Sequence, residues 1–340
     1  MTSPFSPRLP WRGHRPARTG DGRAAAVALL CTAGVLWGFG GVLGSALAER
    51  SGLVPSLVAA GRLGLGGLFL LTYLAVTGVP FPRGRTAWAR IGVLALLSAV
   101  FQSCYFASIA IGSVSAATLV TIGSVPVSLV LLDAILARAR PTLPELRATL
   151  VGVAGLALVV AGSTDPSTAT GPAVDGEASG LHGAAAHLLA LASGLSFAST
   201  AAVSRRPVAG LDERSGIAYG FVAAGGILLL GSAPWAPSAV TLDGRALALL
   251  VAFALLPTAL AYGIYFRGLP RASSAMAGVT TLLEPLTATV LAVVLLGDRP
   301  SWLSWAGTAL LLLSVADAAR HGSTTGPEGD VRPAAPVPRP

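Results

Sequence analysis

Charged residues are scarce in this chain. Asp, Glu, Lys and Arg make up only 11% of its 340 residues, whereas an average soluble domain has about 25%. Lysine is absent altogether, so all 23 basic residues are arginine. A surface built from so few charges would expose very large apolar patches to water. With 53% hydrophobic residues and a mean hydropathy of +0.72, this shortage excludes a soluble enzyme, a disordered chain and a coiled coil, and predicts an integral membrane protein.

Cysteines and enzyme signatures are also lacking. The two cysteines, Cys31 and Cys104, both lie in apolar stretches, which excludes a disulfide framework and favours a packing role. The sequence has no Gly-x-Ser-x-Gly, His-Glu-x-x-His or Walker A pattern. We therefore expect no enzyme activity, no cofactor, no metal site and no direct use of ATP. The net charge of +8 does not predict a nucleic-acid partner, because the arginines are scattered between apolar stretches.

Ten apolar stretches follow one another along the chain, each long enough to cross a bilayer at ~20 residues per helix. They lie at 24–47, 53–77, 90–111, 115–137, 145–162, 181–204, 213–232, 245–266, 272–296 and 302–317. This pattern predicts an all-α integral membrane fold. The polar ends at 1–22 and 320–340 are expected to be disordered cytoplasmic tails, and the segment 163–180 an extracytoplasmic linker.

The distribution of arginine predicts the orientation of the chain in the membrane. When the segments between spans are assigned alternately to the two sides, nineteen arginines fall on the side of the termini and three on the other; Arg62 lies within a span. Basic residues concentrate on the cytoplasmic side of membrane proteins. We therefore expect a multi-pass protein of the cell membrane with both termini in the cytoplasm.

The two halves of the sequence contain an internal repeat. Residues 121–142 align with 280–301 when Pro126 is matched to Pro285, an offset of 159 residues. Each half then contains five spans, and because five is odd, the second half enters the membrane from the opposite side. Inverted repeats of this kind are common in secondary transporters, where they supply the two arrangements that alternating access needs.

Several motifs resemble those of one transporter family. They are VLWGFGG (35–41), Arg62, YFASIAIGSVSAA (105–117), LAYGIYFRGL (260–269) and LLEPLTATVLAVVLLGDRPSWLSWAG (282–307). Together they resemble the EamA-type family of the drug/metabolite transporter superfamily. The resemblance implies two EamA repeats of five helices each, at 24–162 and 181–317. The first half departs from the pattern, since Val125 stands where the second half has Glu284.

Two ionisable residues lie well inside predicted spans, where a charge is costly and usually functional. Arg62 and Glu284 are therefore predicted to line a substrate or ion pathway, and Glu284 is a candidate for exchanging a proton. The alternative is that the two residues pair permanently, with each other or with backbone groups, and stabilise the helix bundle. Asp133 falls near the end of its span and is expected to lie at the membrane interface beside Arg138 or Arg140.

Two prolines within spans predict helix kinks. Pro126 and Pro285 free the backbone carbonyls of Ile122 and Thr281, which need another partner in lipid. Polar side chains repeat at helical spacing beside each proline: Thr280, Glu284 and Thr287 in one span and Thr121, Ser124 and Ser128 in the other. We expect these two stripes to form opposite walls of a central cavity, the alternative being hydrogen bonds between helices.

Five further residues within spans carry polar groups on large side chains. They are Trp37, Gln102, Tyr105, Tyr262 and Tyr265. Cavity lining and buried packing are both consistent with their positions, and we include them in the predicted pathway.

These observations predict a secondary transporter that exports a small metabolite or drug-like solute by alternating access. Protons are a candidate coupling ion, and the lipid bilayer is the other expected partner. A channel, or an intramembrane scaffold or enzyme without transport activity, are the alternatives. Ten spans suffice for a functional monomer, with a homodimer as the alternative.

Overall fold

The computed structural model describes residues 19–112, 114–137, 140–162, 177–232, 234, 240–291, 293–294 and 301–321. Ten helical segments in these ranges are long and apolar enough to cross a membrane, as the sequence predicts. The first begins at Thr19, the sixth at Glu177, and the last ends at His321, so each extends slightly into an expected tail or linker. The remainder of those tails and of that linker lies outside the described residues.

Eight spans are single helices. They are α1 (Thr19–Ser51), α2 (Pro55–Val76), α3 (Arg85–Ile111), α4 (Val114–Ala137), α5 (Leu143–Gly162), α6 (Glu177–Ser204), α7 (Glu213–Ser232) and α12 (Trp302–His321). The other two spans are interrupted. One consists of α8 (Gly244–Ala254), a π-helical segment (Leu255–Leu260) and α9 (Ala261–Gly268); the other of α10 (Ser274–Val279), a 3₁₀ turn (Thr280–Leu282) and α11 (Leu283–Leu291).

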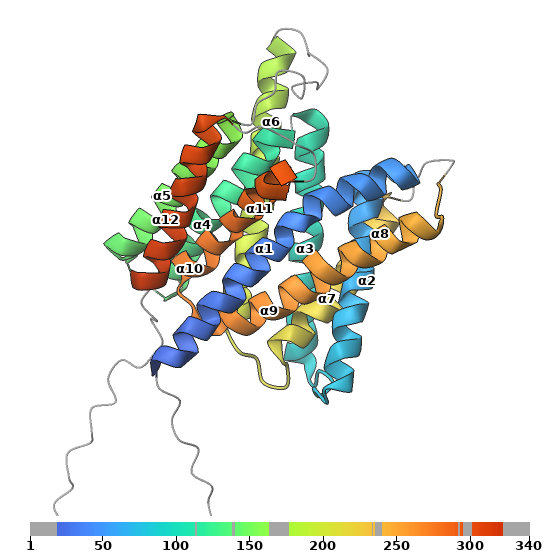
Figure 1. Cartoon of the computed structure of the whole chain (residues 1–340). Helices are drawn as coiled ribbons and strands as arrows, with labels where there is room; N and C mark the ends of the chain where they lie inside the picture. Colours follow the sequence, from blue (N-terminus) through green and yellow to red (C-terminus); the bar gives the residue numbers. More distant parts are fainter. Residues whose placement is uncertain are drawn as a thin grey trace, which may run out of the picture.

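The bundle has two ends, which we name by the ends of the chain. At the terminal face α1 begins and α12 ends (Figure 1), and the loops before α3 and α7 meet there, with the Arg83 N–H donating to the Gly210 carbonyl at 3.0 Å. At the opposite face the Thr241 N–H donates to the Ser51 carbonyl at 3.0 Å, and Arg50 pairs with Asp243.

The two halves of the chain are interleaved, and their contacts are reciprocal. α2 packs on its counterpart α7, and α5 packs on its counterpart α12. The contact of α1 with α11 is matched by that of α6 with α4, which are the corresponding first and fourth spans of the two halves. The inverted repeat predicted from the sequence is therefore present in the fold.

Small residues allow the helices of the two halves to approach closely. Gly155 of α5 lies against Gly307 of α12, and Gly64 of α2 lies against Gly225 of α7. Between α5 and α12 the Ser314 hydroxyl donates to the Ala148 carbonyl at 2.7 Å. Close backbone contact and hydroxyl hydrogen bonds of this kind hold membrane helices together, because lipid removes the hydrophobic drive between them.

A proline produces the π-helical segment. Pro257 has no N–H and its ring clashes with the carbonyl four residues earlier, which belongs to Phe253. The Thr258 hydroxyl donates to that carbonyl at 3.0 Å, so the freed acceptor is satisfied in the absence of water. Phe253, which directly precedes the end of α8, lines the site described next.

Candidate functional site

A cavity of about 390 Å³ lies between the two halves. On α1 it is lined from Trp37 to Ala48, and on α2 from Pro55 to Arg62. These are the end of α1 and the beginning of α2, which meet at the opposite face. The cavity therefore extends from the middle of the bundle toward the opposite face, and α3, α4, α6, α8, α9 and α11 contribute to the rest of its wall.

The two repeats contribute equivalent positions to the cavity wall. Ile122 and Thr281, whose carbonyls are freed by Pro126 and Pro285, both line the cavity. Val125 and Glu284, which are also 159 residues apart, both line it as well. The proline-containing spans of the two repeats thus both contribute to the cavity wall, and of these two equivalent positions only Glu284 carries a carboxylate.

Arg62 is held in place by two neighbours. With the Gln102 amide oriented by its hydrogen-bonding partners, the Gln102 oxygen accepts from Arg62 Nε at 3.2 Å and from Nη2 at 2.5 Å. The guanidinium carbon also lies 5.1 Å from the ring centroid of Phe253, within the range of a cation–π interaction. Arg62 is thus anchored to α3 and α8.

Glu284 lies in the same cavity, with a different environment. Among the described residues its carboxylate has no hydrogen-bond or ion-pair partner, although it interacts electrostatically with Arg62 at longer range. The alternative interpretation of the sequence, a permanent Arg62–Glu284 ion pair, is not what the structure shows. Glu284 lines the cavity and presents its carboxylate as an acceptor there.

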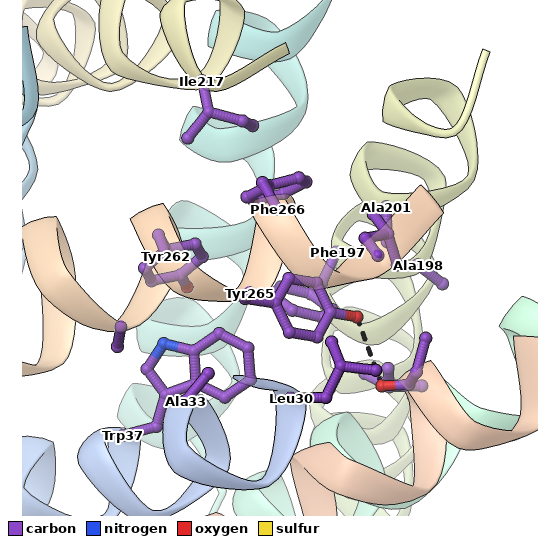
Figure 2. Close-up of a cluster of buried hydrophobic side chains, with 14 of the residues drawn as sticks. Leu30, Ala33, Trp37, Phe197, Ala198, Ala201, Ile217, Tyr262, Tyr265 and Phe266 are labelled. Atoms are coloured by element: carbon purple, nitrogen blue, oxygen red, sulfur yellow. Dashed lines mark hydrogen bonds between the residues drawn. The ribbon is translucent and has the colours of Figure 1, made fainter. Parts of the chain in front are cut away.

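Aromatic rings from α1, α6 and α9 cluster at the inner end of the cavity, and Figure 2 shows how Trp37, Phe197, Tyr262 and Tyr265 lie together. The Trp37 ring centroid lies 5.1 Å from that of Tyr262, 5.0 Å from Tyr265 and 5.8 Å from Phe197. The Trp37 indole N–H is buried and has no hydrogen-bond partner among the described residues. The Tyr265 hydroxyl donates to the Ala277 carbonyl at 3.2 Å, which fixes this ring below the cavity and on the side of the terminal face.

A buried arginine closes the bundle between this aromatic cluster and the terminal face. Arg205, directly after α6, donates from Nη1 to the Ser274 hydroxyl at 2.8 Å and from Nη2 to the Ala272 carbonyl at 2.6 Å. Ser274 in turn donates to Asp133 Oδ2 at 2.6 Å. Burial lowers the pKa of Arg205, and the charge of Asp133 opposes this shift. The contacts tie α4, α6 and α10 together.

Asp133 therefore lies beside Arg205, where the sequence led us to expect Arg138 or Arg140. Its carboxylate oxygen is 3.7 Å from Arg205 Nη1, and the Asp133 side chain is 38% exposed. Arg138 lies outside the described part of the chain, whereas the Arg140 side chain is described and exposed, and no ion pair joins it to Asp133.

The structure brings seven of the eleven predicted pathway residues to the cavity. They are Trp37, Arg62, Gln102, Tyr105, Thr121, Tyr262 and Glu284. Tyr265 packs behind the lining residue Trp37, and Ser128, Thr280 and Thr287 do not line the cavity. The Thr280 hydroxyl donates to the Met276 and Ala277 carbonyls at 3.0 Å, and Thr287 packs against Gly38 of α1. The 3₁₀ turn at Thr280–Leu282 separates Thr280 from the register of Glu284, while Thr287, in α11 with Glu284, is taken up by its contact with α1.

Several lining residues carry no polar signal in the sequence. Phe101, Phe197 and Phe253 line the cavity, but a phenylalanine in an apolar span is indistinguishable from a core residue by composition. Gly40, Gly41 and Gly44 form its wall on α1, and their spacing alone indicates only close helix packing.

The comparisons with known proteins agree with this architecture. The sequence pattern of the EamA-like transporter family matches residues 24–161 and 184–317. The chain belongs to this family. A curated relative, the uncharacterized transporter YwfM of Bacillus subtilis (strain 168), is 27% identical over 284 residues, which cover 83% of this chain and 90% of the relative. A solved crystal structure of another protein has the same fold, with a TM-score of 0.73 at 22% identity over 87% of this chain and 96% of that one.

Membership of the EamA-like family makes the chain a multi-pass membrane transporter of the drug/metabolite type. The two matched segments are the two repeats, and the cavity lies between them.

Proposed function

We propose that this EamA-like protein is a secondary transporter that moves a small solute by alternating access through the cavity between its repeats. The observation that carries the proposal is a pair of equivalent tyrosines in different states. The Tyr105 hydroxyl hydrogen-bonds the Thr118 hydroxyl at 2.9 Å beside the open cavity. The Tyr265 hydroxyl donates to the Ala277 carbonyl, 159 residues after Thr118, and the Tyr265 side chain is fully buried.

The segment that carries this tyrosine therefore borders an open cavity in the first half, and the equivalent segment is closed in the second half. Because the repeats are inverted, exchanging the conformations of the two halves would close the opposite face and open the terminal face. The Arg205 contacts would have to break in that exchange. They form the closed gate of the conformation described here.

Arginine distribution supports the orientation in which the terminal face is cytoplasmic. In that orientation the cavity opens to the outside of the cell membrane, and Arg205, Asp133 and Ser274 close the cytoplasmic side. The mostly apolar, aromatic wall suits a metabolite or drug-like solute with a large apolar part. We propose export as the direction.

Glu284 is the proposed site of proton coupling. Its carboxylate faces the cavity without a partner among the described residues, so protonation and solute binding can compete for it. A carrier that binds either the proton or the solute at such a group exchanges one for the other across the membrane.

Flux measurements in liposomes test the proposed function. Metabolite pools are first screened for compounds that raise the melting temperature of the purified protein, and a compound found in this way is loaded as the radiolabelled solute. We expect saturable uptake that is accelerated by unlabelled solute on the far side, and loss of substrate-dependent proton flux in Glu284→Gln. Unsaturable flux without acceleration would support a channel, and unchanged coupling in the variant would remove Glu284 from the mechanism.

A further inference from the structure

A second pocket, of about 560 Å³, lies at the terminal face, away from the cavity. Its wall comes from the end of α2, the beginning of α7 and the end of α9, with lining residues that include Tyr73, Thr77, Arg214, Arg267 and Arg271. α1, α4, α6 and α11, which help to wall the cavity, do not line it. The pocket is therefore a separate site on the periphery of the bundle.

Two arginines in this pocket form no ion pair among the residues that the structure describes. Arg267 and Arg271 lie four residues apart around the end of α9, are exposed, and make no hydrogen bond or ion pair with any other residue that the structure describes. Like charges at this spacing repel each other on a helix. An anion placed between them would relieve that repulsion and accept hydrogen bonds from both guanidinium groups.

Neither carboxylate of the pocket pairs with these two arginines. Asp212 accepts from Arg214 Nε and Nη2, both at 3.1 Å, and from the backbone N–H groups of Arg214 and Ser215. The Glu213 carboxylate oxygens are buried, and the charges acting on them are those of Arg90 and Asp212. Neither carboxylate neutralises Arg267 or Arg271.

The pocket also borders the lipid. Tyr73 of α2 lines the pocket and is 53% exposed. On the same helix, Val76 is 83% exposed and Leu68, about two turns before Val76, is 51% exposed. This apolar strip runs along α2 into the bilayer region. Phe81, Trp88 and Tyr219 form an aromatic cluster nearby, with ring centroids 5.5–5.7 Å apart, which is typical of the level of the lipid headgroups.

We infer that this pocket binds the phosphate of an anionic phospholipid in the leaflet at the terminal face. The phosphate lies between Arg267 and Arg271, and the acyl chains lie along the exposed strip of α2. Basic pockets between membrane helices bind anionic headgroups in this way. The inference rests on the membrane-embedded fold and is independent of the proposed transport mechanism.

Lipid binding to the purified protein tests this inference. Delipidated wild-type protein is titrated with phosphatidylglycerol, with phosphatidylcholine and with inorganic phosphate alone, and bound lipid is counted by native mass spectrometry. We expect phosphatidylglycerol to bind more tightly than phosphatidylcholine, and R267Q/R271Q to weaken phosphatidylglycerol binding at least about tenfold, because both charges that face the phosphate in the pocket are removed. The matched control is R83Q/R85Q, which removes two other exposed arginines of the terminal face and is expected to change binding less than about twofold.

Three outcomes would overturn the inference. Equal loss of binding in the R83Q/R85Q control would show a diffuse surface charge instead of a site. Unchanged binding in R267Q/R271Q would remove the two arginines from recognition. Binding of inorganic phosphate as tight as that of phosphatidylglycerol would show a site for free anions, to which the acyl chains contribute nothing. Melting temperatures of both double variants, measured without lipid, establish that each is folded.

Discussion

Arg62 donates two hydrogen bonds to the Gln102 oxygen and forms no ion pair with Glu284, although both charges line one cavity. The guanidinium is thus satisfied by a neutral group of the same repeat and by the Phe253 ring. Glu284 is left as the acceptor that faces the cavity.

Replacing Gln102 tests this assignment. Gln102→Leu leaves the buried guanidinium without its acceptor, and we expect it to lower the free energy of unfolding by about 1.5–3 kcal/mol, the usual range for a hydrogen bond to a charged group. Gln102→Glu keeps an acceptor and is expected to retain most of the stability. The measurement is the thermal melting of the purified variants. Equal melting of Gln102→Leu and wild type would show that Arg62 is held by other groups.

Gly38 is predicted to be required for the contact of α1 with α11. A Cβ at this position would meet the Thr287 side chain and the Glu284 carbonyl, whereas a Cβ at Gly41 of the same helix would meet nothing within 4 Å. We expect Gly38→Ala to destabilise the protein by about 1–3 kcal/mol through overpacking. Gly41→Ala should leave the melting temperature unchanged or raise it slightly, and a similar loss in both variants would contradict the packing argument.

Asp212 is predicted to contribute stability that depends on pH. Burial alone would raise its pKa, but the hydrogen bonds from Arg214 and from two backbone N–H groups outweigh burial, so its pKa is lowered. A lowered pKa means that the contribution is present above the unfolded value of about 3.9 and is lost as the pH falls toward the folded value.

The corresponding variants are Asp212→Ala and Asp212→Asn. At pH 7 we expect Asp212→Ala to cost about 1 kcal/mol, because the helix cap and the ion pair with Arg214 are both lost. Asp212→Asn keeps the cap and should cost less. Thermal melting between pH 7 and pH 3 checks this: the difference between wild type and Asp212→Ala should shrink below about pH 4, and a constant difference would show that ionisation of Asp212 is irrelevant.

The ten spans and their inverted repeat could be predicted from the sequence because hydropathy, arginine distribution and matched prolines are properties of the chain itself. The positions of Thr280 and Thr287 could not. A straight helix places both on the face of Glu284. The 3₁₀ turn at Thr280–Leu282 changes the register of Thr280, and its hydroxyl is taken up by its own backbone. Thr287 lies in the same helix as Glu284, but it packs against Gly38 of α1.

The partners of the charged residues were also inaccessible to sequence reasoning. Arg62 and Glu284 are visible as charges within spans, but that Gln102 and Phe253 satisfy Arg62 depends on how α3 and α8 pack against α2. The position of Phe253 depends further on the π-helical segment, where Thr258 replaces the hydrogen bond that Pro257 removes. Such local compensation follows from the three-dimensional structure.

Alternating access itself is tested most directly by the accessibility of one cavity residue from each side of the membrane. Ile122 lines the cavity and is partly exposed, so Ile122→Cys in a C31A/C104A background can be labelled with a membrane-impermeant thiol reagent in right-side-out and inverted vesicles. Adding Arg205→Gln breaks the contacts that close the terminal face, while Arg85→Gln, which changes an exposed arginine of the same face, serves as the control.

We predict that Arg205→Gln raises the labelling rate from the terminal face and lowers it from the opposite face, with no change for Arg85→Gln. Rates that rise from one side without falling from the other, or that do not respond to Arg205→Gln, would contradict the account.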